Sequence, residues 1–350
     1  MATLTSQAIP AGDWAEVNEL YQANGWTDGY PIVPPTEERV AELLEWVLYP
    51  PEYIIGIEPV RARPLTIEKV AINAVMAGCL PEYFPVVCAA VEAICDESFL
   101  LHGCSASTGG SAPLVIVNGP VRTEIGMNSG RNVLANASRA NTTIGRALRL
   151  ILINVLECSP GGFDNSTLGH PGKYTLCIAE DEEDSPWLSV AEERGVAPGS
   201  PVSAVTVFAC ESPRQIMNEW TEEPEELLET YAAAMRGNML EYSIWAGNYV
   251  IVIAKQHRDL LAGAGWDKRM IREFIHERAR VRRCDWEGVG KRSLVLDRDP
   301  NQEFTALQTP DDLIVVAAGG PSGGFGAVFP PWLGNRSRAV TKGIGVCVDC

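Results

Sequence analysis

The chain is 350 residues long, with 46% hydrophobic and 21% charged residues, which is typical of a well-packed globular protein of two domains. Its 45 acidic and 28 basic residues give a formal net charge of −17, which argues against a nucleic-acid or anionic-membrane surface because both need an excess of Lys and Arg. No stretch reaches the roughly 18 apolar residues of a membrane span, and residues 1–14 lack the features of a signal peptide. We therefore expect a cytoplasmic protein whose ten cysteines are thiols, metal ligands or redox groups rather than structural disulfides.

The N-terminal part is predicted to be mainly helical. Residues 13–48 are expected to form two short helices around a loop, and residues 64–78 a third helix. Thr36 and Thr66 are the expected N-caps, because a threonine hydroxyl accepts a hydrogen bond from the free N–H groups of a first helical turn. Gly78 is expected to end the third helix, since glycine readily takes the left-handed conformation found there.

The rest of the chain alternates strand-like and helical segments. In chain order, the pattern predicts a helix at 82–96, a polar loop at 100–112, a strand at 113–120, a helix at 141–157, strands at 172–180 and 203–210, an acidic helix at 223–236, a strand from 249 followed by two helices, and a last strand at 311–318. This alternation predicts an α/β protein of two lobes, with mostly parallel sheets flanked by helices. We place the domains at 1–215 and 216–350, where the sequence turns polar and acidic.

The loop HGCSASTGG is the most reactive-looking stretch. His102 and Cys104 are two residues apart, so they could act as base and thiolate or ligate a metal together. The alternative is a polar turn whose hydroxyls satisfy backbone groups. Of the four histidines, His257 and His276 lie on predicted helices among basic residues, where we expect them to be solvated. Histidine-based proton transfer near neutral pH would therefore use His102 or His170.

The segment STLGHPGKYTLCIAEDEEDSPW is the second candidate. Lys173 lies at its predicted strand, and Glu180 opens a dense run of carboxylates that ends at Asp184. We predict Lys173 and Glu180 to be supporting acid–base groups in catalysis. The carboxylates could bind a hard cation such as Mg²⁺, and a solvated acidic turn is the alternative.

A third candidate is the polar segment before the helix at 141–157. The free N–H groups of a helix start favour an anion. Asn128, Ser129 and Asn141 would line the site, and Arg146 would add a bidentate contact. The alternative is that Asn141 and the neighbouring threonines only cap the helix.

The glycine-rich stretch GGPSGGFG matches neither a dinucleotide nor a P-loop motif, so we identify no nucleotide motif in the chain. It could form a backbone-lined pocket with Gly320, Ser322 and Gly323, or serve close backbone packing. Thr108 and Asn118 complete the candidate substrate-binding residues. Since ligands of open α/β sheets bind at strand ends, we expect these polar loops to meet at one pocket.

Six motifs occur in order: AGCLPEYFPVV, IVNGP, NSGRN, RANTTIGRALRLILINV, LGHPGKYTLCIAEDEEDSPW and SAVTVF. Together they resemble the UGSC family of (seleno)proteins, and the similarity covers most of residues 28–345. Members of that family continue into a smaller α/β domain with a U/C-G-S-C motif, whereas this chain ends at Cys350. The resemblance therefore implies either a separate small U/C-G-S-C partner subunit or a branch without that domain.

The sequence ends in a Cys-x-x-Cys pair, Cys347 and Cys350, which could be redox-active, metal-binding or part of a subunit seam on a docked terminal strand. We predict a cytoplasmic enzyme that acts on a small anionic molecule by thiol-based chemistry, reductive or lyase-like, within a homo- or hetero-oligomer. The alternatives are a metal-dependent hydrolase or hydratase, and a non-catalytic scaffold for a UGSC-type protein. A bound metal ion and the identity of the substrate stay open.

Overall fold

The computed structural model describes residues 4–135, 138–197, 199 and 202–345, so the expected redox pair Cys347 and Cys350 lies outside the described residues. The helices are α1 (Trp14–Ala23), α2 (Glu37–Leu44), α3 (Ile67–Ala77), α4 (Phe84–Ile94), α5 (Leu101–Ala106), α6 (Val121–Glu124), α7 (Arg139–Asn154), α8 (Val190–Glu193), α9 (Pro224–Glu241), α10 (Lys255–Gly263) and α11 (Lys268–Arg278). The strands are β1 (Ile54–Glu58), β2 (Arg63–Thr66), β3 (Ala112–Asn118), β4 (Cys177–Ala179), β5 (Ala204–Cys210), β6 (Arg214–Met217), β7 (Tyr249–Ile253), β8 (Arg280–Arg282), β9 (Glu303–Thr305), β10 (Leu313–Ala317), β11 (Phe325–Phe329) and β12 (Val340–Gly343).

Two four-stranded sheets form the centre of the molecule, in the orders β12-β5-β3-β4 and β10-β7-β11-β6. Each sheet has one parallel pair, β3–β4 or β7–β10, and two antiparallel pairs. The predicted α/β class, with parallel pairs flanked by helices, is confirmed. The expected predominance of parallel pairing is wrong. Long connections with packed helices join β3 to β4 and β7 to β10, as parallel neighbours require, whereas β5 and β11 return as antiparallel neighbours.

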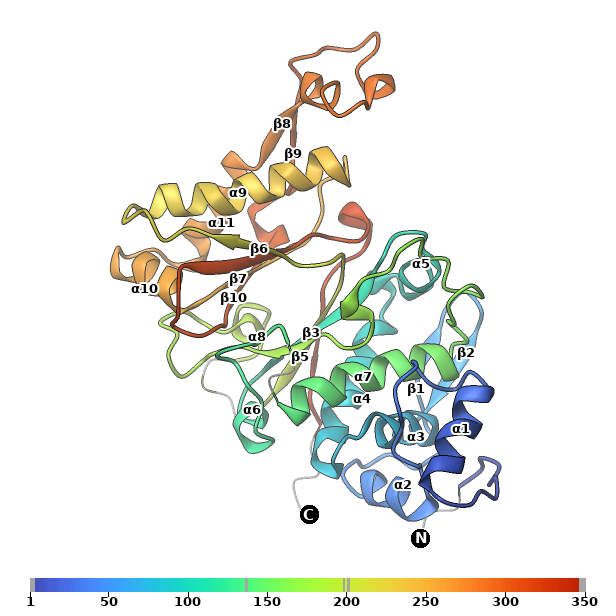
Figure 1. Cartoon of the computed structure of the whole chain (residues 1–350). Helices are drawn as coiled ribbons and strands as arrows, with labels where there is room; N and C mark the ends of the chain where they lie inside the picture. Colours follow the sequence, from blue (N-terminus) through green and yellow to red (C-terminus); the bar gives the residue numbers. More distant parts are fainter. Residues whose placement is uncertain (1–3, 136–137, 198, 200–201, 346–350) are drawn as a thin grey trace.

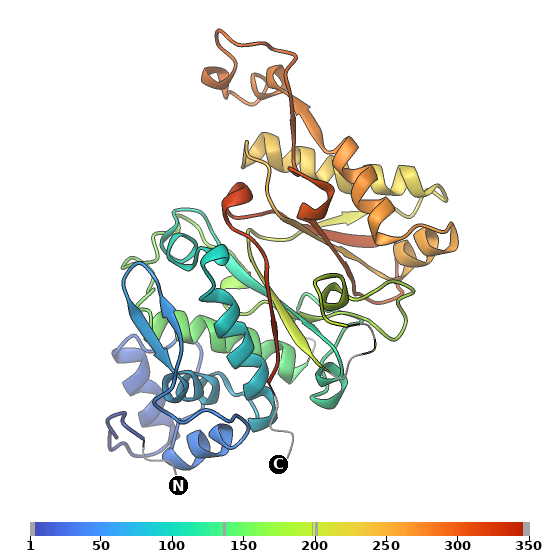
Figure 2. The ribbon, with the colours of Figure 1, turned by 180° about the vertical axis from the view of Figure 1, so that it is seen from behind.

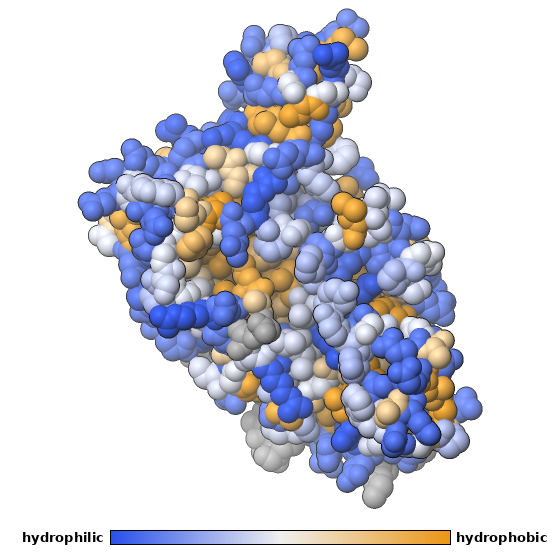
Figure 3. All heavy atoms as spheres, viewed as in Figure 1, coloured by the Kyte–Doolittle hydropathy of each residue, from blue (hydrophilic) through white to orange (hydrophobic). Residues whose placement is uncertain are grey.

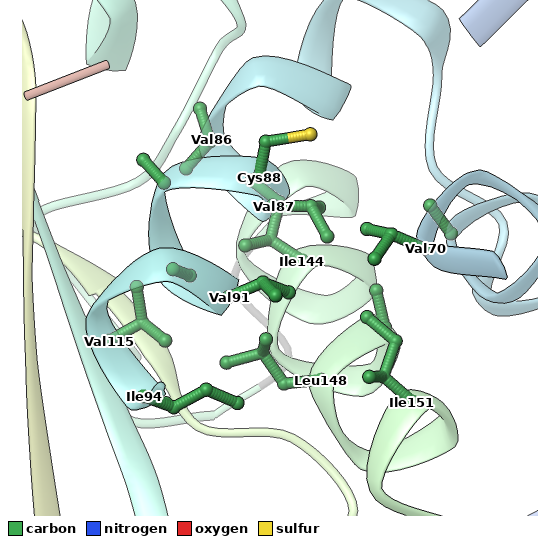
Figure 4. Close-up of a cluster of buried hydrophobic side chains, with 14 of the residues drawn as sticks. Val70, Val86, Val87, Cys88, Val91, Ile94, Val115, Ile144, Leu148 and Ile151 are labelled. Carbon is green, nitrogen blue, oxygen red and sulfur yellow. The ribbon is translucent and has the colours of Figure 1, made fainter. Parts of the chain in front are cut away.

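The two sheets pack face to face between two layers of helices (Figures 1 and 2). Leu114 and Ile116 of β3 share one buried core with Val250 and Val252 of β7. Val115, on the opposite face of β3, belongs to a second core together with α3, α4 and α7 (Figure 4). A third core lies between the other sheet and helices α9 and α11. The period-2 alternation along each strand therefore builds four layers, helix–sheet–sheet–helix.

The two sheets repeat one plan. Read as β4-β3-β5-β12 and β10-β7-β11-β6, they have the same sequence of parallel and antiparallel neighbours. The fourth strand of each sheet comes from the other half of the chain, since β6 follows β5 and β12 follows β11. The chain crosses to the second sheet between Cys210 and Arg214, close to the domain boundary placed at 215, and β12 then returns to the first sheet.

Local signals in the sequence match the structure at several helix ends. Thr36 accepts a hydrogen bond from Arg39 N, Thr66 accepts one from Lys69 N, and Gly78 takes the left-handed conformation at φ +92°. The described residues contain no helix that is both long and apolar enough to cross a membrane.

The expectation that His257 is solvated is wrong. Its ring is 1% exposed, with Nδ1 3.0 Å from the hydroxyl of Tyr231 and Nε2 2.9 Å from the carbonyl oxygen of Asn218. The basic neighbours that suggested a solvated helix face include Arg258, which is itself buried. His257 is a hydrogen-bonded core residue of the second lobe.

Candidate functional site

The start of β3 gathers polar groups from segments that are far apart in sequence. The predicted loop at 100–112 is partly helical, because Leu101–Ala106 forms α5, and residues 107–111 then lead into β3. Residues 164–173 pack against this loop. Thr167 N donates to the carbonyl oxygen of Thr108 over 2.9 Å, and Ser166 Oγ donates to that of Gly109 over 2.9 Å. We call this cluster, with the end of β5 beside it, the β3-entrance site.

Lys173 lies at the centre of the β3-entrance site. Its Nζ donates to both oxygens of Asp164, at 2.8 and 2.7 Å, and to Ser166 Oγ at 2.6 Å. Arg149 Nη1, from α7, lies 3.2 Å from Asp164 Oδ2. Although burial alone would raise it, the hydrogen bonds from Lys173 and Ser166 hold the pKa of Asp164 below its usual value. Since Ser166 accepts from Lys173 and donates to Gly109, its hydroxyl positions the lysine rather than being activated by it.

Glu211 follows the last residue of β5 and faces this cluster. The hydroxyl of Tyr242 donates to Glu211 Oε1 over 2.6 Å. Burial raises the pKa of Glu211, outweighing the opposing effects of Tyr242, the charge of Lys173 and the N–H of Gly110. In the neighbouring loop, a Cβ on Gly109 would lie 2.5 Å from the Tyr242 hydroxyl, so a larger residue at this position would displace the Tyr242 side chain. A carboxyl with a raised pKa therefore lies beside a lysine that is ion-paired with another carboxylate.

The structure does not bring His102 and Cys104 together as a base and a thiolate. His102 Nδ1 lies 3.3 Å from Glu58 Oε1, and its ring packs edge-on against Phe163 at 5.1 Å between centroids. Cys104 Sγ instead lies 3.0 Å from Ser111 Oγ. Burial raises the pKa of the Cys104 thiol to about 12, so the thiol is neutral near neutral pH. His170 takes a local role, since its Nδ1 accepts from Gly172 N over 3.1 Å.

Asn118 and Glu180 lie at the opposite end of β3. The Glu180 carboxylate is 1% exposed and accepts hydrogen bonds from the Asn118 side chain at 2.7 Å and from Lys268 Nζ at 2.9 Å. The N–H groups of Val190 and Ala317 also donate to it, at 2.7 and 3.3 Å. A strand of this length spans roughly 20 Å, so Glu180 and Lys173 do not share a site. Glu180 ties α8, α11, β3 and β10 together.

The other carboxylates of the acidic run are paired with cations. Arg122 Nη2 lies 3.0 Å from Glu182 and 2.9 Å from Glu183, and Arg258 Nη2 lies 2.8 Å from Asp181. The solvated turn expected as the alternative describes the end of the run, where the side chains of Glu183 and Asp184 are more than half exposed. Across the ranges that the structure describes, no group of three or more His, Cys, Asp or Glu side chains is placed to hold a metal ion.

The predicted anion-binding segment is closed by its own hydrogen bonds. The Asn141 side chain accepts from Asn128 N over 2.9 Å and donates to the carbonyl oxygens of Asn128 and Cys177. Arg146 is paired with Asp28, at 2.8 Å from each carboxylate oxygen, so it fixes the N-terminal loop rather than facing the helix start.

The loop at 128–131 and the glycine-rich loop at 319–323 contact each other. The carbonyl oxygen of Ser129 accepts a hydrogen bond from Gly319 N over 2.8 Å, and a Cβ on Gly320 would lie 2.5 Å from Arg131 Cγ. Ser322 and Gly323 lie farther along the turn into β11. The polar loops that we expected at one pocket therefore form two separate clusters. Thr108, Cys104 and Lys173 lie at the start of β3, and the remaining loops meet beyond its end.

Sequence reasoning missed Asp164, Ser166, Glu211 and Tyr242. Glu211 carried a usable signal, because it is a charged residue directly after a buried strand. Tyr242 follows a long amphipathic helix, and its partner is 31 residues away, so no local pattern indicates it. In the comparison with known proteins, no family model matches the chain, and no curated protein matches it.

Proposed function

We propose that the chain is an enzyme that moves protons on a small anionic molecule, in a lyase-like reaction, at the β3-entrance site. The observation that supports this best is that Glu211, whose pKa is raised by burial, lies within range of the charge of Lys173. Two neighbouring titratable groups in contrasting environments are typical of an acid and base that work together. Glu211 would exchange the proton, and Lys173 would neutralise charge on the substrate.

The charge balance of the cluster favours an anionic substrate. Arg149 and Lys173 both contact Asp164, so these three side chains together carry one positive charge in excess. The cavity behind Lys173 is about 20 Å³, room for a single water. A substrate would therefore bind on the solvent side, where Tyr242 is 43% exposed.

Hydrogen exchange tests the proposal whichever product the reaction forms. Small mono- and dicarboxylic acids are incubated with the protein in D₂O, and the exchange of their carbon-bound hydrogens for deuterium is followed by NMR. The wild type should exchange at least one acid. Glu211→Gln and Lys173→Gln should slow this exchange by about 100-fold or more, the usual contribution of a general acid–base group. Arg269→Gln, on the exposed face of α11, is the matched control and should exchange normally.

The Cys104 and Glu211 variants separate this proposal from thiol chemistry. If Cys104→Ser keeps full exchange while Glu211→Gln loses it, the acid–base assignment holds. If Glu211→Gln exchanges as fast as the wild type, the assignment fails. The assignment also fails if the wild type exchanges none of the acids in the panel.

A role alongside a small U/C-G-S-C subunit is a second proposal, supported by the six sequence motifs. Affinity purification of the chain from its native cells, followed by mass spectrometry, should then recover a small protein with that motif. Its absence from the purified material would contradict this role.

A further inference from the structure

The hairpin of β8 and β9 carries residues 283–302 away from the body of the molecule (Figures 1 and 2). We call residues 280–305 the arm. The arm contains six basic and five acidic residues, in a chain whose net charge is −17. Arg292 and Arg298 are exposed, and neither makes an ion pair within the part of the chain that the structure describes. The arm is thus close to neutral, with two exposed arginines that have no ion-pair partner among the described residues, on an acidic protein.

A cavity of about 420 Å³ lies at the base of the arm, within the size range of ligand pockets. Figure 3 shows apolar surface where the arm joins the body. Trp286 and Phe304 contribute aromatic rings, Trp245 is 58% exposed, and Arg298 and Glu303 supply the charges. The pocket suits a large apolar side chain flanked by negative charge.

The same chain carries a surface of that kind. Residues 219–229, which we call the acidic segment, contain six glutamates and no basic residue. Trp220 within it is 75% exposed. Glu222 and Glu223 are exposed, and neither makes an ion pair among the described residues.

We propose that the arm is a docking surface for a second copy of this chain, with Trp220 of one protomer in the arm pocket of the other. The neighbouring glutamates would then face Arg292 and Arg298. Both complementary surfaces belong to one chain, which favours a second copy over an unrelated partner. The proposal is independent of the proposed enzymatic function.

The positions of the two surfaces suit a two-fold dimer. The acidic segment leads into α9, and the pocket wall at 244–246 follows its end. The 18 residues of α9 span about 27 Å. An axis across the middle of two antiparallel α9 helices would bring each acidic segment onto the partner's arm at once, as an isologous interface requires. The side of α9 away from its core presents the exposed Ala233, whose small side chain allows close approach.

Sedimentation velocity of the full chain at micromolar concentrations, in low and high salt, tests the proposal. The wild type should dimerise, and more weakly in high salt. Trp220→Ala should raise the dissociation constant at least about tenfold, as expected for an anchoring tryptophan. Leu168→Ala, at a 94% exposed position on the other lobe, is the control and should leave the dimer unchanged.

Charge exchange gives a result that misfolding cannot imitate. The variant R292E/R298E should be monomeric, and so should E222R/E223R. Combining the four substitutions in one chain should restore the dimer. The proposal is overturned by a wild type that is monomeric at every concentration, by a dimer that Trp220→Ala leaves intact, or by a combined variant that stays monomeric.

Discussion

Replacing Lys268 with methionine should be among the most damaging single changes in the chain. Lys268 and Glu180 are 3% and 1% exposed and lie 2.9 Å apart, so the substitution leaves a buried carboxylate without its cation. Breaking one partner out of a buried pair costs about 3–5 kcal/mol. The Asn118 side chain and the N–H groups of Val190 and Ala317 remain, which places the expected loss near the lower end of that range.

Urea unfolding followed by circular dichroism measures this loss. The double variant K268M/E180Q should be more stable than the sum of the two single effects predicts, by about 1 kcal/mol or more, because it leaves no buried charge. The exposed pair Arg269–Glu273 offers a matched control, and Arg269→Ala should change the free energy of unfolding by under about 1 kcal/mol. If Lys268→Met costs no more than this control, the assignment of Glu180 as a structural anchor is refuted.

Three further predictions concern the β3-entrance site. Because burial raises the pKa of Glu211, the native state binds the carboxyl proton more tightly than the unfolded chain does. The free energy of unfolding should therefore fall as pH rises from 4.5 through the raised pKa. Glu211→Gln should flatten that part of the pH profile in urea titrations. Cys104, with a pKa of about 12, should resist iodoacetamide in the native protein and react after unfolding, as mass spectrometry can show. Gly109→Ala should displace the Tyr242 hydroxyl, which would lie 2.5 Å from the new Cβ. Because the hydrogen bond from Tyr242 lowers the pKa of Glu211, its loss should raise that pKa further. NMR titration of the Glu211 carboxyl should show the increase, and an unaltered pKa would contradict the prediction.

Features that depend on neighbours in sequence could be predicted well. The caps Thr36 and Thr66 and the helix stop Gly78 each act on groups three or four residues away, so the local sequence contains the whole interaction. The continuous apolar run of β3 likewise predicted a buried strand. The direction of neighbouring strands was not predictable in this way, because it depends on which strand each connection returns to.

The charged residues show where sequence reasoning fails. Glu180 and Lys268 are 88 residues apart, and Arg146 and Asp28 are 118 apart. A pattern of neighbouring charges predicts a solvated surface, and only the fold shows that these groups are paired and buried. His257 was misjudged for the same reason, since its partners Tyr231 and Asn218 come from other elements.

The repeated plan of the two sheets places the two proposed surfaces at corresponding positions. The connection from α7 to β4 matches the connection from α11 to β10 in the two halves. The first packs on the loop before β3, because Thr167 and Ser166 donate to the carbonyl oxygens of Thr108 and Gly109. The second closes on itself, because Arg283 donates to the carbonyl oxygens of Leu294 and Asp299 within the arm. One connection can therefore serve chemistry within the chain while its counterpart is left free to bind another molecule.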